Sequence, residues 1–141
     1  MKKIIFSILC LVSTTLIACN HEEIPVNPND LPKAAQSFIQ KYFAKSTIAI
    51  AIKDGNEYEV KFANGYEIDF DKNGEWKDVD CQMTAIPQGI VPTTIDTYVK
   101  NNFAQNFIVK ISRDRHGYDV ELNNDLDLEF DSNGKFIRID D

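Results

Sequence analysis

Hydrophobic residues follow a helical period in two segments of the chain. Residues 31–43 and 91–103 have apolar residues at steps of three and four, with polar residues between them. Such spacing places the apolar side chains on one face of an amphipathic helix. These positions are Leu31, Ala34, Ala35, Phe38, Ile39, Tyr42 and Phe43 in the first segment, and Val91, Ile95, Tyr98, Val99 and Phe103 in the second. Each segment is therefore predicted to be a helix that buries one stripe.

After each predicted helix the hydrophobic period changes to two. Apolar residues alternate with charged residues in 58–62 and 66–71, and again in 118–122 and 126–131. This alternation is typical of antiparallel strands that pack on one face and meet water on the other. Residues rich in Asn, Asp and Gly predict the turns between strands. They lie at 63–66, 71–74, 123–125 and 131–134.

The two helix-to-strand segments are copies of one unit. Residues 31–81 align without a gap to residues 91–141, and residues 82–90 link them. We predict an α+β fold of two tandem helix-plus-antiparallel-sheet repeats, with the helices on one face of the sheet and the other face open. A unit of this size is too small for a robust core of its own. The two copies are therefore expected to share one continuous sheet or to pack closely.

The first strand of each copy is ambiguous. Ile48, Ile50 and Ile52 share one parity in copy one, whereas copy two has Phe107, Val109 and Ile111 at the opposite parity. Either a β-bulge shifts the register or this strand is apolar on both sides.

The N-terminal segment resembles a lipoprotein signal peptide. Residues 1–18 combine two lysines with an apolar run that is short for a membrane span. The following Leu16-Ile17-Ala18-Cys19 resembles a bacterial lipobox, which implies that Cys19 is lipidated and anchors the protein to the membrane. Residues 19–30 are predicted to be an extended tether. Asn20 favours an outer-membrane lipoprotein of the cell envelope, on the periplasmic side or at the cell surface.

The net charge limits the class of partner. The chain carries a formal charge of −7, and residues 1–18 contain two lysines and no acidic residue. An acidic protein lacks the basic surface that nucleic acids require, so no nucleic-acid partner is predicted. With Cys10 in the signal peptide and Cys19 lipidated, Cys81 remains without a cysteine partner in its own chain. It is predicted to be a small apolar residue, with reactivity or pairing between chains as the alternative.

The chain contains no recognisable set of catalytic residues. His21 lies in the predicted tether and His116 in a turn, and no nucleophile motif or zinc-ligand spacing is present. Asp71 and Asp131 each begin an Asp-x-Asn-Gly turn, which places glycine at the fourth position instead of the sixth position of a calcium loop. They are weak metal candidates and good turn residues. We predict no enzyme activity and no cofactor.

Acidic residues gather on the polar side of the predicted strands. They are Asp119, Glu121, Asp127, Glu129 and Asp131 in copy two, and Glu59, Glu67 and Asp69 in copy one. Like charges on neighbouring strands are unfavourable unless basic residues such as Lys110, Arg113 or Arg138 offset them. The face is either an ordinary solvated surface that prevents edge pairing or a candidate binding face. As a binding face, it would suit a basic protein or a weak multi-carboxylate cation site.

The chain resembles the PepSY-like family of secreted proteins of Bacteroidetes. The resemblance covers most of residues 31–141 and rests on short motifs in both copies. They are Leu31-Pro32, Phe38-Ile39-x-x-Tyr42-Phe43, Tyr58-Glu59-Val60-Lys61, Glu67 to Trp76, Val91-Pro92, Gly117 to Leu122 and Leu128 to Gly134. The family is also described as β-lactamase-inhibitor-like, which implies helices on one side of a long antiparallel sheet. No motif of this chain matches an inhibitory residue.

Together these features predict a non-enzymatic lipoprotein of the envelope that binds a basic envelope or secreted protein through its open acidic face. The alternative is a binding protein for a small ligand or for calcium. The family's largely unassigned function favours neither, because a shared fold is not a shared function. The sequence does not predict an oligomeric state.

Overall fold

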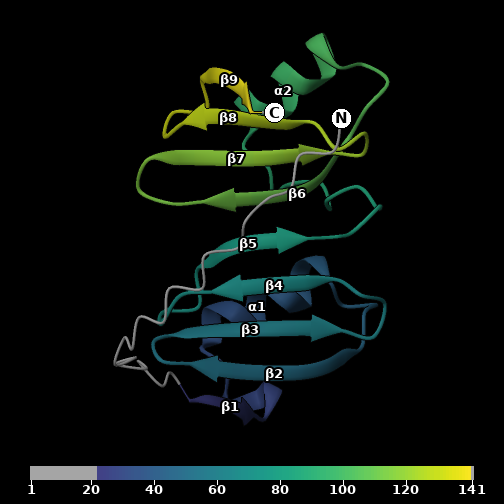
Figure 1. Ribbon diagram of the computed structural model, residues 1–141. Coiled ribbons are helices and arrows are strands. Elements are labelled where there is room, and N and C mark those ends of the chain that lie inside the picture. The colour runs from purple at the N-terminus through teal and green to yellow at the C-terminus, as the bar shows by residue number, and fades with distance from the viewer. Residues whose placement is uncertain (1–21, 141) are drawn as a thin grey trace, which may run out of the picture.

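The computed structural model describes residues 22–140, in which nine strands form one antiparallel sheet (Figure 1). Each strand pairs with its neighbour in chain order. None of the described helices is long and apolar enough to cross a membrane. The elements are β1 (Glu23–Val26), the 3-10 helix η1 (Pro28–Asp30), α1 (Lys33–Tyr42), β2 (Ile48–Asp54), β3 (Glu57–Phe62), β4 (Glu67–Phe70), β5 (Trp76–Asp80), α2 (Thr93–Asn102), β6 (Ile108–Arg113), β7 (Gly117–Leu122), β8 (Asp127–Asp131) and β9 (Phe136–Asp140).

The predicted fold class, an α+β fold of two tandem helix-plus-sheet repeats, is wrong. The fold is largely β, because a single nine-stranded sheet dominates it and α1 and α2 have only ten residues each. The two copies are not separate sheets, since β5 of the first pairs with β6 of the second through Asp78↔Ser112, Val79↔Ile111 and Asp80↔Lys110. Of the two arrangements left open by the sequence, the structure has the continuous sheet.

The segment predicted to be an extended tether is partly built into the sheet. Residues 23–26 form β1, which pairs antiparallel with β2 along its whole length. The η1 turn follows, and Asn27 caps it by accepting a hydrogen bond from the Asn29 backbone N–H at 2.9 Å. The two prolines and the polar residues of 20–30 favoured a tether over a strand, and the strand's partner lies about thirty residues further along the chain. The predicted signal peptide and Cys19 lie outside the described residues.

A β-bulge resolves the ambiguity of the first strand in each copy. The register of β2 against β3 shifts between Ile48 and Ile50, and the register of β6 against β7 shifts between Ile108 and Lys110. After the bulge Ala51 and Ile111 occupy equivalent positions and both are buried, whereas Ile50 is exposed. The bulge was the first of the two alternatives.

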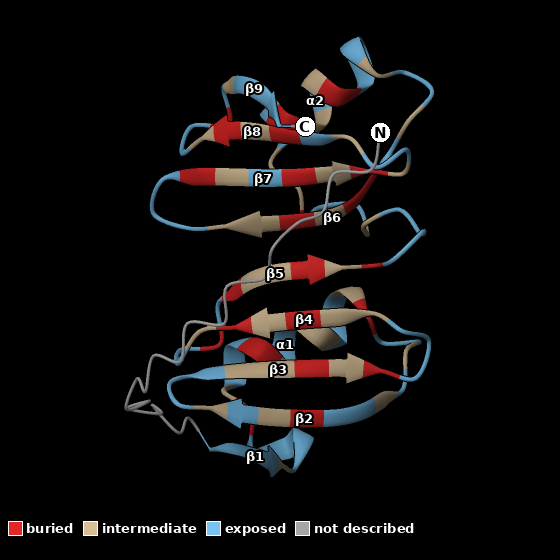
Figure 2. Cartoon of the chain, in the orientation of Figure 1, coloured by how far each residue is buried: buried red, intermediate tan, exposed pale blue. Residues whose placement is uncertain are grey.

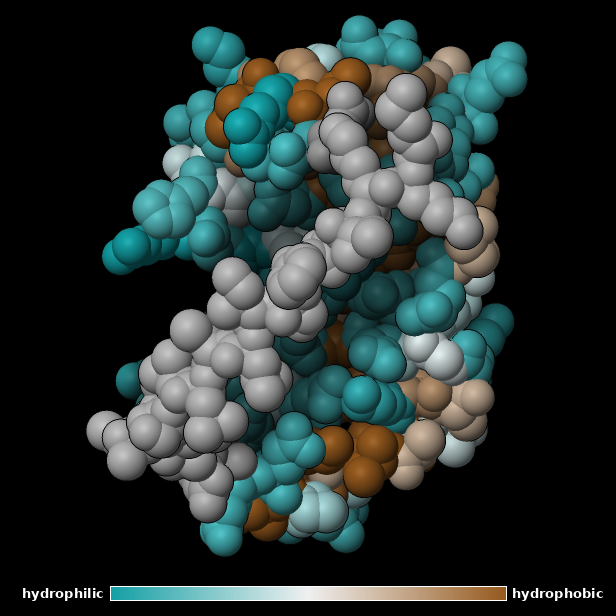
Figure 3. Space-filling view, viewed as in Figure 1, coloured by the Kyte–Doolittle hydropathy of each residue, from teal (hydrophilic) through white to brown (hydrophobic). Residues whose placement is uncertain are grey.

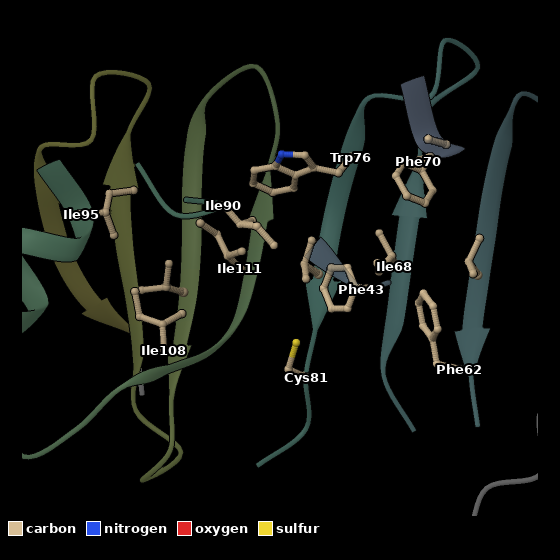
Figure 4. Packing of buried hydrophobic residues seen from close by; sticks show 14 of the residues in the cluster. Phe43, Phe62, Ile68, Phe70, Trp76, Cys81, Ile90, Ile95, Ile108 and Ile111 are labelled. Carbon is tan, nitrogen blue, oxygen red and sulfur yellow. The ribbon is translucent and has the colours of Figure 1, made fainter. Parts of the chain in front are cut away.

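One row of apolar residues crosses the sheet on the face that the helices cover. Its members are cross-strand neighbours, and from β2 to β8 each is at most 2% exposed (Figure 2). The register gives the row as Val26, Ala51, Val60, Ile68, Val79, Ile111, Val120, Leu128 and Ile139. The core therefore continues through the junction of the two copies, where Trp76, Cys81 and Ile111 point to the same side of the sheet (Figure 4).

Each helix packs on this face through an aromatic residue. Phe38 of α1 meets the edge of Phe70 at a ring-centroid distance of 5.8 Å, and Tyr98 of α2 meets Phe130 in the same way at 5.5 Å. These edge-to-face contacts are favourable beyond the area they bury. In Figure 1, α1 lies behind β3 and β4. Both helices thus cover one face, because Phe70 and Phe130 are equivalent positions, and the opposite face is left open.

Candidate functional site

Two rows of polar side chains cross the open face of the sheet. Each row is a chain of cross-strand neighbours from β3 to β9, at positions that alternate with the buried apolar row. The first row is Glu59, Asp69, Asp78, Ser112, Asp119, Glu129 and Arg138, and the second is Lys61, Glu67, Asp80, Lys110, Glu121, Asp127 and Asp140. Where the strands are visible in Figure 3, this face is mostly hydrophilic.

The rows bring together all the predicted face residues except Asp131. The carboxylate of Asp131 instead closes its own turn, since its Oδ1 accepts hydrogen bonds from the backbone N–H groups of Asn133 and Lys135 at 2.9 Å. Asp71 does the same for Asn73 and Glu75, at 2.8 and 3.0 Å. Both weak metal candidates therefore act as turn residues. In residues 22–140 no three His, Cys, Asp or Glu side chains are grouped so that they could hold a metal ion.

Sequence analysis did not place Asp78 and Asp80 on the face. A bulge between Asp69 and Phe70 inserts Lys77 into β5, so the polar parity after Trp76 changes. Asp78 then stands opposite Asp69, and Asp80 opposite Glu67. The hydrophobic pattern held a signal, because Trp76 and Val79, which are both buried, are three residues apart instead of two.

Two lysines offset part of the negative charge. Lys61 lies 3.0 Å from Glu59 and 3.7 Å from Glu67. Lys110 lies 3.7 Å from Asp78 and 3.8 Å from Asp80, across the junction between the two copies. All these side chains remain partly exposed, so each pair contributes little to stability. Arg113, which the sequence offered as a further cation, instead stacks on Trp76 at 4.1 Å and pairs with Glu75.

The two copies carry different charges at equivalent positions in the centre of the open face. In copy two Arg138 donates two hydrogen bonds to Glu129, at 2.7 and 2.8 Å, and lowers the pKa of that carboxyl. In copy one the equivalent positions hold Asp69 and Asp78, so two carboxylates face each other. Burial and then the charge of Asp78 raise the pKa of Asp69 to about 6. Among the described residues, no lysine or arginine forms an ion pair with Asp69.

Copy two also contains carboxyl groups in unfavourable surroundings, next to the Glu129–Arg138 pair. Burial raises the pKa of Asp119, and the charge of Glu129 adds to that rise. Burial also raises the pKa of Glu121, with a further contribution from Asp127. These residues line a shallow hollow of about 330 Å³ on the open face, and Glu59 and Asp69 line another of about 260 Å³.

The unfavourable position of Asp69 predicts a pH-dependent stability. Its pKa is near 3.9 in an unfolded chain, so the folded state binds more protons between about pH 4 and pH 6 and stability falls as the pH rises through this range. The shift corresponds to about 3 kcal/mol, which solvent screening reduces to about 1–2 kcal/mol. Asp69→Asn should therefore be more stable than the wild type above pH 6 and should lose this part of the pH dependence in urea unfolding.

Glu129→Gln is the matched comparison, with the opposite sign. Because Arg138 lowers the pKa of Glu129, the carboxylate stabilises the fold above its unfolded pKa and loses that effect as the pH falls. The glutamine variant should be the less stable protein at neutral pH. If Asp69→Asn is also less stable than the wild type at pH 7, the ionised carboxylate of Asp69 does not destabilise the fold and this prediction is wrong.

Within residues 22–140, the histidine and the cysteine do not form a catalytic site. His116 is exposed in the turn before β7, where its backbone N–H donates to Asp114 at 2.7 Å. Cys81 is fully buried, and burial raises the pKa of its thiol to about 12, so it has little thiolate to react. The prediction of an apolar role for Cys81 agrees with this position.

Comparison with protein families identifies one match. The family described as "putative beta-lactamase-inhibitor-like, PepSY-like" matches residues 15–62 and 56–138. The two overlapping segments agree with tandem copies of one unit, as the resemblance in the sequence implies. A comparison with curated proteins finds no match.

Three solved structures from Bacteroides are similar over nearly all of their own chains. A "putative calcium-regulated periplasmic protein" from Bacteroides thetaiotaomicron is 37% identical, with a TM-score of 0.81, covering 84% of this chain and 97% of that one. Two proteins from Bacteroides vulgatus, both described as a "putative periplasmic protein" and one as of unknown function, are 36% and 35% identical, with TM-scores of 0.83 and 0.80. The match covers 86% and 85% of this chain and 99% and 100% of theirs. All three descriptions support a location of this protein in the cell envelope.

Proposed function

Because this chain belongs to the PepSY-like family, for which no catalytic activity is indicated, we propose that it is a non-enzymatic binding module of the bacterial envelope. Its open acidic face would dock a basic envelope or secreted protein. The lipid on Cys19 would anchor it to the outer membrane. The family's inhibitor-like description is compatible with such a role, in which binding itself is the activity.

One observation carries this proposal. Glu59, Asp69 and Asp78 stand side by side across three strands, on a face that no described element covers. Like charges in direct cross-strand contact destabilise a sheet. The Glu129–Arg138 pair shows that the same fold can hold a cation at this position. A basic partner would supply to copy one the positive charge that Arg138 supplies to copy two, which raises the affinity and the rate of encounter.

The test compares two variants that remove equal charge. The first, called the row variant, neutralises the three adjacent carboxylates and preserves side-chain shape. It combines Glu59→Gln, Asp69→Asn and Asp78→Asn. Glu22→Gln, Asp30→Asn and Asp125→Asn, which lie outside both rows, form the control. The wild type and the control should capture the same basic protein from an envelope extract, and the row variant should lose it. Equal capture by the row variant, with its fold intact by circular dichroism, would reject the acidic face as the docking surface.

Calcium binding is the second candidate, and the description of the Bacteroides thetaiotaomicron relative as calcium-regulated favours it. Oxygen ligands from several carboxylates are what Ca²⁺ prefers. If calcium binds the row, millimolar CaCl₂ should raise the melting temperature of the wild type by several degrees, and neither MgCl₂ nor CaCl₂ with chelator should do so. The row variant should not respond. An unchanged melting temperature would remove this candidate and leave protein docking.

A further inference from the structure

The buried apolar row that crosses the sheet ends in an exposed residue. Its members from β2 to β8 are at most 2% exposed, whereas Ile139 on β9 is 45% exposed. The equivalent residue of copy one, Val79 on β5, is 0% exposed. The difference arises because β5 has β6 beside it, while β9 is the last strand of the described sheet. Figure 3 shows hydrophobic atoms gathered over β9.

At the junction of the two copies, β5, which is the equivalent of β9 in copy one, pairs with a further strand. β5 carries a bulge at Lys77 and pairs with β6 only through the three residues that follow, 78–80. Just beyond them, the Cys81 N–H donates to the Val109 carbonyl at 2.9 Å. Since strand residues alternate in direction, the backbone groups of Val79 also point toward β6.

β9 repeats these features without the neighbour. Its register against β8 shifts at the same place, so Ile137 takes the position of the bulge residue, and residues 138–140 follow. Ile139 is the equivalent of Val79, so its N–H and C=O point away from β8 to the outer edge. A bulge and charged residues often protect an edge from pairing. Here the bulge does not, because β5 carries the same bulge and pairs.

The other edge of the sheet is less suited to accept a strand. β1 contains Pro25, which has no N–H to donate, and proline is a common protection of edge strands. Pairing of β9 with β1 of another copy would also be head-to-tail and would leave open ends for a fibre. Pairing of β9 with itself closes after two copies.

The charges select one register for this self-pairing. A two-fold axis at Arg138 would set two arginines against each other. An axis at Ile139 sets Arg138 opposite Asp140 of the second copy, twice, and places Ile139 on Ile139. We propose that two copies of this chain pair antiparallel through β9, centred on Ile139, and so join their sheets edge to edge. The contact is small, so the dimer is weak and reversible.

Sedimentation of purified residues 20–141 tests the pairing. A chain of this extent is suitable, because the solved relatives fold with 84–86% of this chain matched. From about 10 μM to 1 mM, concentrations set by the weak affinity expected for a small interface, the mass should rise from that of a monomer toward that of a dimer. Ile139→Lys should stay monomeric throughout, and Ile24→Lys, at a similarly exposed isoleucine of β1, should dimerise like the wild type. A monomeric wild type, or loss of the dimer with Ile24→Lys alone, would overturn the proposal.

Crosslinking tests the register. Facing residues of a hydrogen-bonded antiparallel pair have Cα atoms about 5.5 Å apart, within the range for a disulfide. Ile139→Cys should therefore form a covalent dimer under mild oxidation, at least several-fold faster than Ile24→Cys. Buried Cys81 should not contribute. Equal rates for the two variants would mean that random collisions, and not β9 pairing, bring the chains together.

Discussion

Phe70→Ala is expected to lower the free energy of unfolding by about 3–5 kcal/mol. Phe70 is fully buried at the end of β4, and its ring meets Phe38 of α1 edge to face. The variant would lose this contact and leave a cavity between α1 and the sheet, which the rigid strands cannot close. Urea unfolding followed by circular dichroism measures the change. Met83→Ala, at a loop residue that is 69% exposed, is the control and should change stability by less than about 0.5 kcal/mol.

Phe130→Ala extends this result to the second copy. Phe130 occupies the equivalent position and meets Tyr98 of α2. Because β5 and β6 join the copies into one sheet with one core, both variants should shift a single cooperative transition by similar amounts. Two separate transitions, each sensitive to only one of the variants, would mean that the copies fold independently.

Gly74→Ala is expected to have the second largest effect, a decrease of about 2–5 kcal/mol in the free energy of unfolding. Gly74 has a φ of +84°, which an alanine adopts at a cost of about 1–2 kcal/mol. An added Cβ would also lie 2.7 Å from the Ala35 backbone nitrogen and 2.8 Å from the Cβ of Pro32. The turn between β4 and β5 would thus push against the start of α1, and such overpacking costs a further ~1–3 kcal/mol.

Gly65→Ala separates the two causes. Gly65 has nearly the same φ, +89°, but a Cβ there would be 3.7 Å from Gln82, an ordinary contact. This variant should therefore show the backbone cost alone. If the two variants unfold at the same urea concentration, the close approach of the turn to α1 does not contribute to stability.

The pattern of the sequence was sufficient for the individual elements but not for the fold class. Alternation in 58–62 and 118–122 predicted β3 and β7, and helical spacing predicted α1 and α2. The union of the sheets depends on Val79 and Ile111, which are more than thirty residues apart, and no local period reports such a pairing. The helical pattern of two segments led to the prediction of an α+β class. Each helix has only ten residues, however, and the β-sheet dominates the fold.

The candidate face shows the same limit. Alternation alone placed Glu59, Asp69 and Glu129 on the polar side of their strands. It could not show that Asp78 opposes Asp69 while Arg138 opposes Glu129, because each bulge changes the parity of the strand that follows. The difference between the two copies is therefore a property of register, and the raised pKa of Asp69 follows from that register.

The pairing of β1 with β2 would also determine how far a lipid-anchored domain can stand from a bilayer. If Cys19 carries the lipid, only residues 20–22 separate it from the first residue of β1, and an extended chain covers roughly 3.5 Å per residue. The β1 edge would then be held within about 15 Å of the lipid surface. With strands spaced about 4.8 Å apart, β9 lies about 40 Å further along the sheet. An upright sheet would present its acidic face sideways, to proteins that diffuse along the same membrane.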